Sequence, residues 1–306
     1  MARRWYGRDR GLTFRMGLTM FLLGLVYVAF ISALIAAGVG AVLVLVIAAA
    51  ILLAQLFLSD KLALGAMGAR VTTPEEAPEL HATVERLCQL ADLPKPRVAV
   101  ARTDLPNAFA AGRSPKTSTV CVTTGLMERL EPRELEGVLA HELSHIANRD
   151  VVVMTIASFL ATVAGLLVRW GVYTGSFGGG RRQNGNAAAA FLLVLLVSVV
   201  VYVLSFLLLR ALSRHREFAA DRGGAIMTGA PSQLAAALSK ITGSMARIPT
   251  RDLRAAEGLN AFFIVPAVAR GFSLSSLFHT HPPVEKRIER LLALQAQMEG
   301  APLAAV

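Results

Sequence analysis

Long uncharged runs alternate with segments of mixed polarity along this chain of 306 residues. The first run extends from Met16 to Leu58 and contains no charged side chain. One crossing of a lipid bilayer needs about 20 apolar residues, so this run predicts two transmembrane helices joined by a tight turn near residues 36–40. The run is far longer than the apolar core of a signal peptide, about 7–15 residues, and a cleaved signal peptide is therefore not expected.

Two further apolar runs, 151–168 and 187–209, flank a loop rich in glycine and polar residues. They predict a second transmembrane hairpin, which returns the chain to the side of the membrane that it left. The run at 151–168 is close to the shortest length that can cross a bilayer, so full or partial embedding of this segment stays open. The interiors of the expected transmembrane helices carry no ionisable residue. This argues against a transporter, because such residues mark the path of a transported solute.

The remaining segments, 59–150 and 211–306, have the charge content of water-soluble structure. Capping residues followed by an amphipathic spacing predict a helix within residues 72–93. β-Branched residues at 97–102 and 118–126 predict two strands, and the segment between these strands carries turn residues. Residues 211–306 are helical by pattern.

The expected organisation is a basic N-terminal segment, a transmembrane hairpin, part of a soluble domain, a second hairpin and the rest of that domain. These parts comprise residues 1–15, 16–58, 59–150, 151–210 and 211–306. An even number of crossings places both soluble parts on one side of the membrane, where they can fold together. We therefore expect four transmembrane helices in two hairpins and a mainly helical α+β domain with a small β-sheet.

Composition supports the membrane interpretation and adds an orientation. Hydrophobic residues make up 54% of the chain and the mean hydropathy is +0.54, above the range of soluble domains. The net charge is +10, but the basic residues do not gather on one helix with interleaved aromatics, so no nucleic-acid partner is expected. Five arginines directly precede the first apolar run and predict a cytoplasmic N-terminus: Arg3, Arg4, Arg8, Arg10 and Arg15. With an even number of crossings, the soluble domain and both termini are then expected to be cytoplasmic.

The two cysteines, Cys88 and Cys121, form no CxxC pair, which is compatible with a reducing compartment.

The segment "VLAHELSHIANRD" (138–150) lies in a predicted helix that opens with Pro132. His141 and His145 are four residues apart and share one face of such a helix, where neutral imidazoles can bind zinc. Glu142 projects to the side, from where it can reach a water at the metal and act as general base. The alternative interpretation is an ordinary polar helix face.

A third metal ligand is expected after the second hairpin, in "LSRHREFAADRGGAIMTG" (212–229). Glu217 and Asp221 are again four residues apart, so one carboxylate can ligate while the other orients a ligating histidine. His215 is a competing ligand, but its spacing turns it away from Glu217. The alternative is a salt-bridged helix face with the neighbouring arginines 214, 216 and 222.

Four motifs in this order resemble the HtpX branch of the M48 membrane metalloproteases. They are "NAFAAG" (107–112), "HELSH" (141–145), "EFAAD" (217–221) and "FHTHPPVEKRIERL" (278–291). The resemblance implies a zincin-like protease domain in which His141, His145 and Glu217 hold one zinc ion per subunit and Glu142 is the catalytic base. It aligns Asp221 with the last residue of the family's E-x-x-x-D motif. Ser144 occupies a position where glycine is common, a small change.

The same resemblance implies a zinc metalloendopeptidase of the bacterial cytoplasmic membrane. Members of this family degrade misfolded or damaged membrane proteins on the cytoplasmic side, in protein quality control and the stress response, and can cleave themselves. The expected partners are protein substrates, the lipid bilayer and other membrane quality-control proteases.

Several residues near these motifs are further candidates for substrate binding or transition-state stabilisation. Asn107, Ala108 and Phe109 precede the zinc helix, where zincins present an edge strand to an extended peptide; for Asn107 the alternative is a structural loop residue. In the last motif, His279, His281 or Arg287 can supply a donor to the developing oxyanion, and the spacing does not distinguish them.

For two of these candidates a structural role competes with the functional one. His281 can instead pack against Pro282 and Pro283. Asn148 lies seven residues after His141, near the ligand face, but can also cap the end of the helix.

Two other functions are alternatives to a surface endopeptidase. An intramembrane metalloprotease would hold its zinc within the bilayer, but charged residues surround the motif, among them Glu131, Arg133, Glu134 and Asp150. A membrane scaffold that keeps a zinc site without catalysis has the same ligands, and only an activity measurement separates it from an enzyme.

Overall fold

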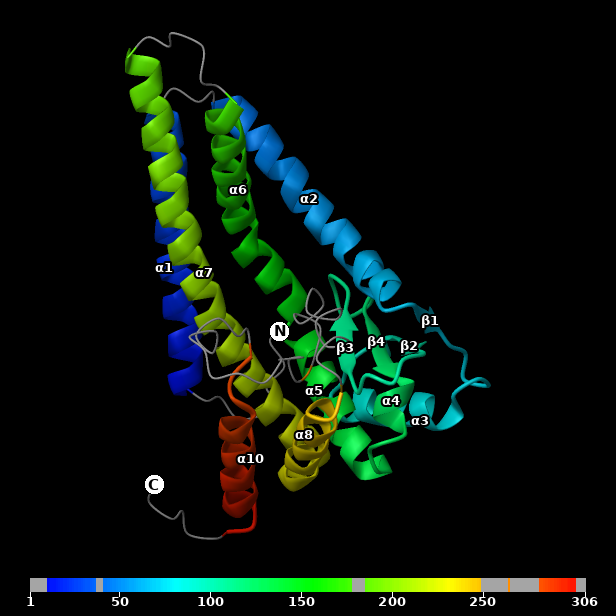
Figure 1. Cartoon of the computed structure of the whole chain (residues 1–306). Helices are drawn as coiled ribbons and strands as arrows, with labels where there is room; N and C mark the ends of the chain where they lie inside the picture. Colours follow the sequence, from blue (N-terminus) through cyan, green and yellow to red (C-terminus); the bar gives the residue numbers. More distant parts are fainter. Residues whose placement is uncertain (1–9, 37–40, 178–184, 249–263, 265–280, 301–306) are drawn as a thin grey trace. The chain divides into compact units, whose positions relative to one another are not determined.

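The computed structural model describes residues 10–36, 41–177, 185–248, 264 and 281–300. These residues form long helices and one small sheet, as the sequence predicts (Figure 1). The chain separates into two compact units. One unit consists of residues 11–57 and 152–212, and the other of residues 1–10, 58–151 and 213–306.

The first unit, the membrane unit, is built from four helices that are long and apolar enough to cross a bilayer. They are α1 (Arg10–Ala36), α2 (Ala41–Ala66), α6 (Asp150–Phe177) and α7 (Gly185–Thr228). The candidate spans within them cover Gly11–Ile35, Ala49–Ala66, Asp150–Arg169 and Leu192–Thr228. The prediction of four transmembrane helices is confirmed.

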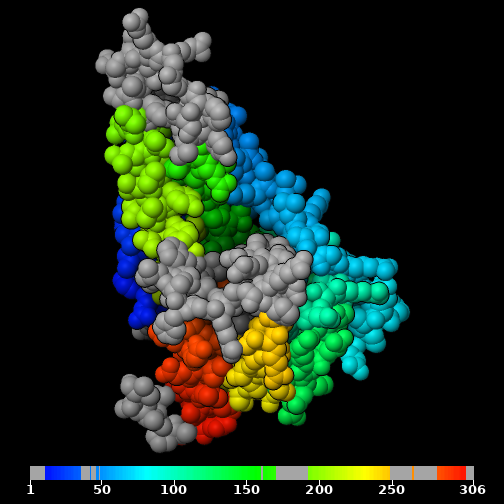
Figure 2. Space-filling model, viewed as in Figure 1, coloured from blue at the N-terminus to red at the C-terminus, as the bar shows by residue number. Residues whose placement is uncertain are grey.

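Many large apolar side chains of these helices are exposed; Figure 2 shows the surface of the molecule coloured by residue number. Exposed examples are Phe21, Leu25, Val28, Leu196, Val203 and Leu207. Other apolar residues pack between the helices, among them Phe30, Leu34, Ala164 and Val201. A hydrogen bond of 3.1 Å joins the Gln55 amide of α2 to the Thr162 hydroxyl of α6, a polar contact typical of packed transmembrane helices. An apolar outside with an interior of small and polar contacts is what a lipid environment requires.

The second unit, the soluble unit, contains a four-stranded sheet with strand order β1-β2-β4-β3. Its strands are β1 (Ala69–Val71), β2 (Arg97–Ala101), β3 (Ala108–Ala111) and β4 (Thr119–Thr123). β2 and β4 are parallel, and the other two pairings are antiparallel, so β3 forms one edge. β2 and β4 confirm the two predicted strands. β3 lies in a segment that the sequence indicated as turns.

The helices of the soluble unit are α3 (Pro78–Leu90), the short α4 (Thr124–Met127), α5 (Pro132–Ala147), α8 (Pro231–Met245) and α10 (Val284–Met298). Their apolar faces form a common core with the sheet. Buried members include Leu87, Val120, Leu139, Leu143, Leu234 and Leu238. α5 therefore runs through the interior of the unit.

The start of α5 is fixed by reciprocal hydrogen bonds. Glu131 and Glu134 form a capping box, and Pro132 occupies the first turn. Lys240 of α8 pairs with both glutamates, at 3.2 Å and 2.8 Å. Gly137 allows α8 to approach closely, because a Cβ at this position would lie 3.1 Å from the Leu234 nitrogen. These contacts fix the start of α5 against α8.

Two helix boundaries differ from the sequence prediction. α2 continues past Leu58 to Ala66, and Ala63 near its end packs on the sheet beside Ala99 and Phe109. The helix predicted to open with Pro132 and to include residues 138–150 instead ends at Ala147, and α6 begins at Asp150. Burial of the α2 end against the sheet, and a backbone reversal after Asn148, account for these differences.

Candidate active site

His141 and His145 lie on the buried face of α5, one turn apart. Their Nε2 atoms are 3.1 Å apart, and their rings meet edge to face with centroids separated by 4.7 Å. His141 is 1% exposed. The two imidazoles therefore turn one nitrogen each toward a common point.

Glu217 of α7 reaches the same point. Its Oε2 lies 3.6 Å from Nε2 of His141, and its Oε1 lies 3.5 Å from Nε2 of His145. Within the described residues, these three side chains form a group able to hold a metal ion, with ligand atoms within 4.8 Å of one another. The expected three-ligand set is thus gathered in one place.

Each histidine turns its other ring nitrogen toward a carboxylate. Nδ1 of His141 lies 3.0 Å from Oδ1 of Asp221, and Nδ1 of His145 lies 2.5 Å from Oδ2 of Asp150. An ionised carboxylate only accepts hydrogen bonds, so Nδ1 is the donor nitrogen of each ring, and Nε2 is the nitrogen that faces the other ligand groups. The two Nε2 atoms and the Glu217 carboxylate converge, an arrangement that fits a bound cation, and Nη2 of Arg287 lies 3.5 Å from Nε2 of His141.

Glu142 is buried beside this group and is 4% exposed. Burial raises the pKa of its carboxyl to about 7, and the negative charge of Glu217 acts in the same direction. The positive charges of His145 and Arg287 and a hydrogen bond from the Ala110 backbone oppose the rise. A carboxyl group poised near neutrality suits proton transfer in both directions.

Residues 74–295 match the family model described as "Peptidase family M48". The chain belongs to peptidase family M48. Its relatives in that family include a "Protease HtpX homolog" of Moorella thermoacetica, 56% identical over 97% of this chain and 99% of that protein. "Protease HtpX homolog 1" of Streptomyces coelicolor is 56% identical over 96% of both chains. "Protease HtpX homolog 2" of Methanosarcina mazei is 53% identical over 97% of this chain and 100% of that protein. The expected HtpX-like resemblance is confirmed.

The fold also resembles a solved structure. S. mikatae Ste24p superposes with a TM-score of 0.54 at 16% identity, over 92% of this chain and 66% of that chain. At this identity the likeness concerns the fold alone. Together, the family, the apolar helices and the His–His–Glu group make this chain a multi-pass membrane metalloprotease of family M48.

A buried arginine from α10 links the two carboxylates of α7 in this M48 protein. Arg287 donates from Nε and Nη2 to Asp221 at 2.8 Å and 2.7 Å, and its Nη1 lies 3.3 Å from Oε2 of Glu217. Burial alone would raise the pKa of Asp221, but Arg287 and His141 hold it below its usual range. The pKa of Glu217 is likewise raised by burial and, more strongly, lowered by His281 and Arg287. Both carboxylates are therefore ionised at neutral pH.

The other residues predicted from the last motif and the helix end are also located. His281 places Nδ1 3.2 Å from Oε2 of Glu217 and is 9% exposed. Asn148 is the C-cap residue of α5, and its N–H donates to the Ser144 carbonyl at 3.0 Å. His279 lies outside the described residues.

The three predicted substrate-binding residues are buried. Asn107 has no exposed surface, and its Oδ1 accepts a 3.0 Å hydrogen bond from the Ile264 N–H. Ala108 belongs to the main core, and Phe109 packs in a smaller cluster with Cys121. Any contact with a substrate by these residues thus comes from the strand backbone.

Two charged residues of the site were not singled out by the sequence. Asp150 pairs with both His145 and the guanidinium of Arg216. Burial lowers the pKa of Arg216 to about 9, although Glu217 acts in the opposite direction. In the sequence, Arg216 figures only in the alternative of a salt-bridged helix face, and Asp150 only among the charged residues around the motif. The neighbouring Arg149 has a positive φ of 55°, the one local sign of a reversal.

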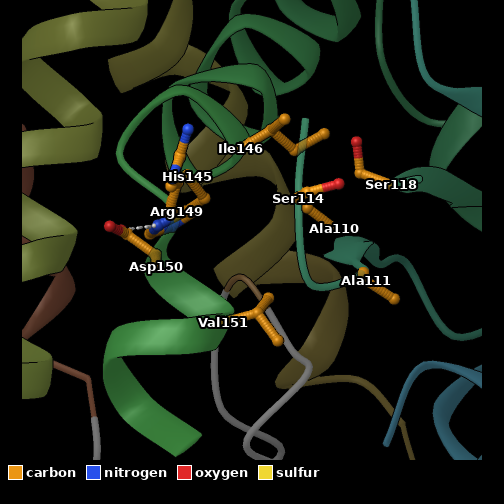
Figure 3. A pocket seen from close by; sticks show the side chains of 10 residues that line it. Ala110, Ala111, Ser114, Ser118, His145, Ile146, Arg149, Asp150 and Val151 are labelled. Atoms are coloured by element: carbon orange, nitrogen blue, oxygen red, sulfur yellow. Dashed lines mark hydrogen bonds and ion pairs between the residues drawn. The ribbon is translucent and has the colours of Figure 1, made fainter. Parts of the chain in front are cut away.

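A small pocket lies between the end of α5 and the edge strand β3. Figure 3 shows His145 and Asp150 on one side and the β3 residues Ala110 and Ala111 with Ser114 and Ser118 on the other. The pocket thus connects the edge strand with a candidate metal ligand.

Proposed function

We propose that this M48 protein is a zinc endopeptidase that hydrolyses peptide bonds at the cytoplasmic surface of the membrane. The observation that carries the proposal is the convergence of two imidazole nitrogens and one carboxylate beside the buried Glu142. Two nitrogens and one carboxylate oxygen form the donor set of many catalytic zinc sites. When bound, zinc supplies Lewis-acid chemistry and brings the pKa of a water toward about 7.

Glu142 transfers the protons of the reaction. Its carboxylate takes a proton from the attacking water, and the resulting carboxylic acid gives that proton to the leaving amine nitrogen. Because burial raises its pKa to about 7, the group can serve as base and then as acid at the same pH. No covalent acyl-enzyme is needed.

His281 is the donor that we assign to the oxyanion. The Arg287 guanidinium is turned toward Asp221, Glu217 and the Ile264 carbonyl, so it organises the carboxylates. His281 is buried beside Glu217, with its Nδ1 3.2 Å from Oε2 of that carboxylate. A donor here would stabilise the charge that develops on the carbonyl oxygen.

The outer edge of β3 is the surface that we assign to the substrate backbone. Asn107 and Thr123 form a hydrogen-bonded pair through their backbones and the Thr123 hydroxyl. From this pair onward, hydrogen-bonded and non-hydrogen-bonded residue pairs alternate between β3 and β4. In this register Ala108 and Ala110 direct their N–H and C=O groups away from β4. An extended peptide can pair there as an additional strand, largely independent of its sequence. The hydrogen bond between Ala110 and Glu142 places this edge next to the catalytic carboxyl.

The membrane environment suggests the substrates and the side. Arginines precede α1, and Arg210, Arg214, Arg216 and Arg222 lie at the end of the second hairpin that adjoins the soluble unit. This distribution favours a cytoplasmic soluble unit. A protease continuous with transmembrane helices meets other membrane proteins first, so misfolded or damaged membrane proteins, including copies of the chain itself, are its proposed substrates.

The deciding experiment compares Glu142→Gln and Glu217→Ala in the purified full-length protein, with Glu136→Gln on the same helix as control. We expect Glu142→Gln to abolish casein cleavage while about one zinc ion per chain remains, and Glu217→Ala to lose both. Chelation by o-phenanthroline should stop the wild-type reaction. Full activity of Glu142→Gln or of the chelated protein would refute the mechanism. A wild-type protein that binds zinc but cleaves no peptide bond would instead support a non-catalytic scaffold.

A further inference from the structure

The ring nitrogen of His145 that faces away from the other ligand groups contacts a carboxylate outside the four sequence motifs. Its Nδ1 contacts Oδ2 of Asp150 at 2.5 Å, and Oδ1 of the same carboxylate pairs with Arg216. Asp150 is 7% exposed and Arg216 is 2% exposed, so water screens this pair weakly. The three side chains form one connected network, His145–Asp150–Arg216.

The contact between His145 and Asp150 depends on a break in the helix. On a continuous α-helix, a residue five positions after His145 would project about 140° away from it. Arg149 adopts a left-handed conformation with φ of 55°, and its N–H donates to the Ile146 carbonyl at 3.1 Å. The chain therefore reverses after Asn148, and Asp150 turns back toward the metal centre.

The second half of the network comes from a distant part of the chain. Asp150 is the first residue of α6, and Arg216 lies on α7, one residue before the candidate ligand Glu217. The ion pair therefore joins the two ends of the segment that contains the second transmembrane hairpin. Because a buried carboxylate without a counter-charge is unfavourable, Arg216 stabilises the Asp150 carboxylate behind the His145 ring.

We propose that Asp150 and Arg216 are positioning residues of the metal centre. Asp150 fixes the Nδ1–H tautomer and the ring orientation of His145, and Arg216 fixes the carboxylate of Asp150. The proposal rests on the proposed zinc function, and it predicts that metal affinity depends on residues outside the ligand set. Asp221 has the corresponding position behind His141, so each histidine is backed by its own carboxylate.

The test measures zinc affinity of the full-length protein in detergent, by competition with a chromophoric chelator. Asp150→Asn should weaken binding by about 10–100-fold, because a neutral amide replaces the carboxylate behind His145. Arg216→Gln should weaken it by a smaller factor, and Arg216→Lys, which keeps the charge, should recover most of the loss. Asp104→Asn and Arg214→Gln are matched controls, an exposed aspartate and a nearby arginine of α7, and should bind as wild type does.

A second readout separates positioning from folding. Cobalt-loaded Asp150→Asn should show an altered visible spectrum, whereas a variant that is only less stable should keep the wild-type spectrum in its folded fraction. If Asp150→Asn does not fold, the proposal is tested by the difference in zinc affinity between Arg216→Gln and Arg216→Lys. Wild-type affinity and spectrum in Asp150→Asn, or equal affinities of the two Arg216 variants, would overturn the proposal while leaving the zinc function intact. Absence of zinc binding by the wild type would overturn both.

Discussion

Gly224 of α7 lies directly against the backbone of His141 on α5. A Cβ atom on Gly224 would fall 2.7 Å from the His141 nitrogen and 2.9 Å from its Cα. Two helices can approach this closely only where one of them has no side chain. This contact sets the distance between α5 and the face of α7 that carries Glu217 and Asp221.

Gly224→Ala should therefore separate the ligand helices. The clash is with backbone atoms of a buried helix, so relief requires a shift of one helix, at a cost of about 1–3 kcal/mol. We expect a lower zinc affinity and a lower midpoint of thermal unfolding. Gly243→Ala is the matched control, because this glycine of α8 has open space at the Cβ position and alanine favours helix. Equal zinc affinity of the two variants would refute this role of Gly224.

Arg287→Met should destabilise the soluble unit strongly. The substitution leaves Asp221 and Glu217 buried without the cation that contacts both, and removing one partner of a buried ion pair costs about 3–5 kcal/mol. Thermal unfolding in detergent measures the loss. Arg290→Met on the same helix removes an exposed guanidinium that lies 4.2 Å from the Phe218 ring, and a much smaller change is expected. A similar decrease in unfolding temperature in both variants would show that the buried ion pairs of Arg287 do not contribute more to stability than the exposed Arg290.

The two ligand helices could be predicted because their chemistry repeats at helical spacing. His141 and His145, and Glu217 and Asp221, each recur after four residues, a local pattern that needs no tertiary knowledge. The membrane helices were predictable for a similar reason, since an uncharged run longer than a bilayer crossing has few alternatives.

Features that depend on tertiary contacts were not predictable. Asp150 reaches His145 only because Arg149 is left-handed, and the sequence there contains no glycine to signal the reversal. β3 is four residues long and has three alanines with one phenylalanine, so its strand character comes from pairing with β4 rather than from propensity. The Asn107 side chain accepts from the Ile264 N–H, 157 residues away in the sequence.

Both cysteines should be unreactive in the native protein. Burial raises the pKa of Cys88 to about 11 and that of Cys121 to about 12, and the thiolate is the reactive form. We expect no alkylation by iodoacetamide at pH 8 and complete alkylation after denaturation in SDS, as measured by mass spectrometry. Rapid labelling of the native protein would contradict the burial of both thiols.

The same thiols predict a loss of stability at alkaline pH. An unfolded thiol has a pKa near about 8.5, so above that pH the unfolded chain releases protons that the folded chain retains. The contribution is fully present below about pH 8.5 and decreases as the pH rises toward the folded values. A Cys88→Ala, Cys121→Ala double variant should show a weaker decrease in unfolding temperature between pH 8 and pH 10 than the wild type. Identical pH slopes would indicate that these thiols do not titrate differently in the two states.

Ala110→Pro tests whether the outer edge of β3 binds the substrate backbone. The N–H of Ala110 points away from β4, and proline is tolerated at edge positions whose N–H is not used by the sheet. The fold should therefore persist, while the donor to Glu142 and to an incoming peptide is lost. We expect a higher KM and a lower kcat for casein-derived peptides, with zinc content unchanged. Ala110→Gly keeps the N–H and should retain a KM close to that of the wild type. If Ala110→Pro hydrolysed peptides with the wild-type KM, the substrate would have to bind elsewhere, because this substitution removes the central donor of the proposed pairing without touching a metal ligand.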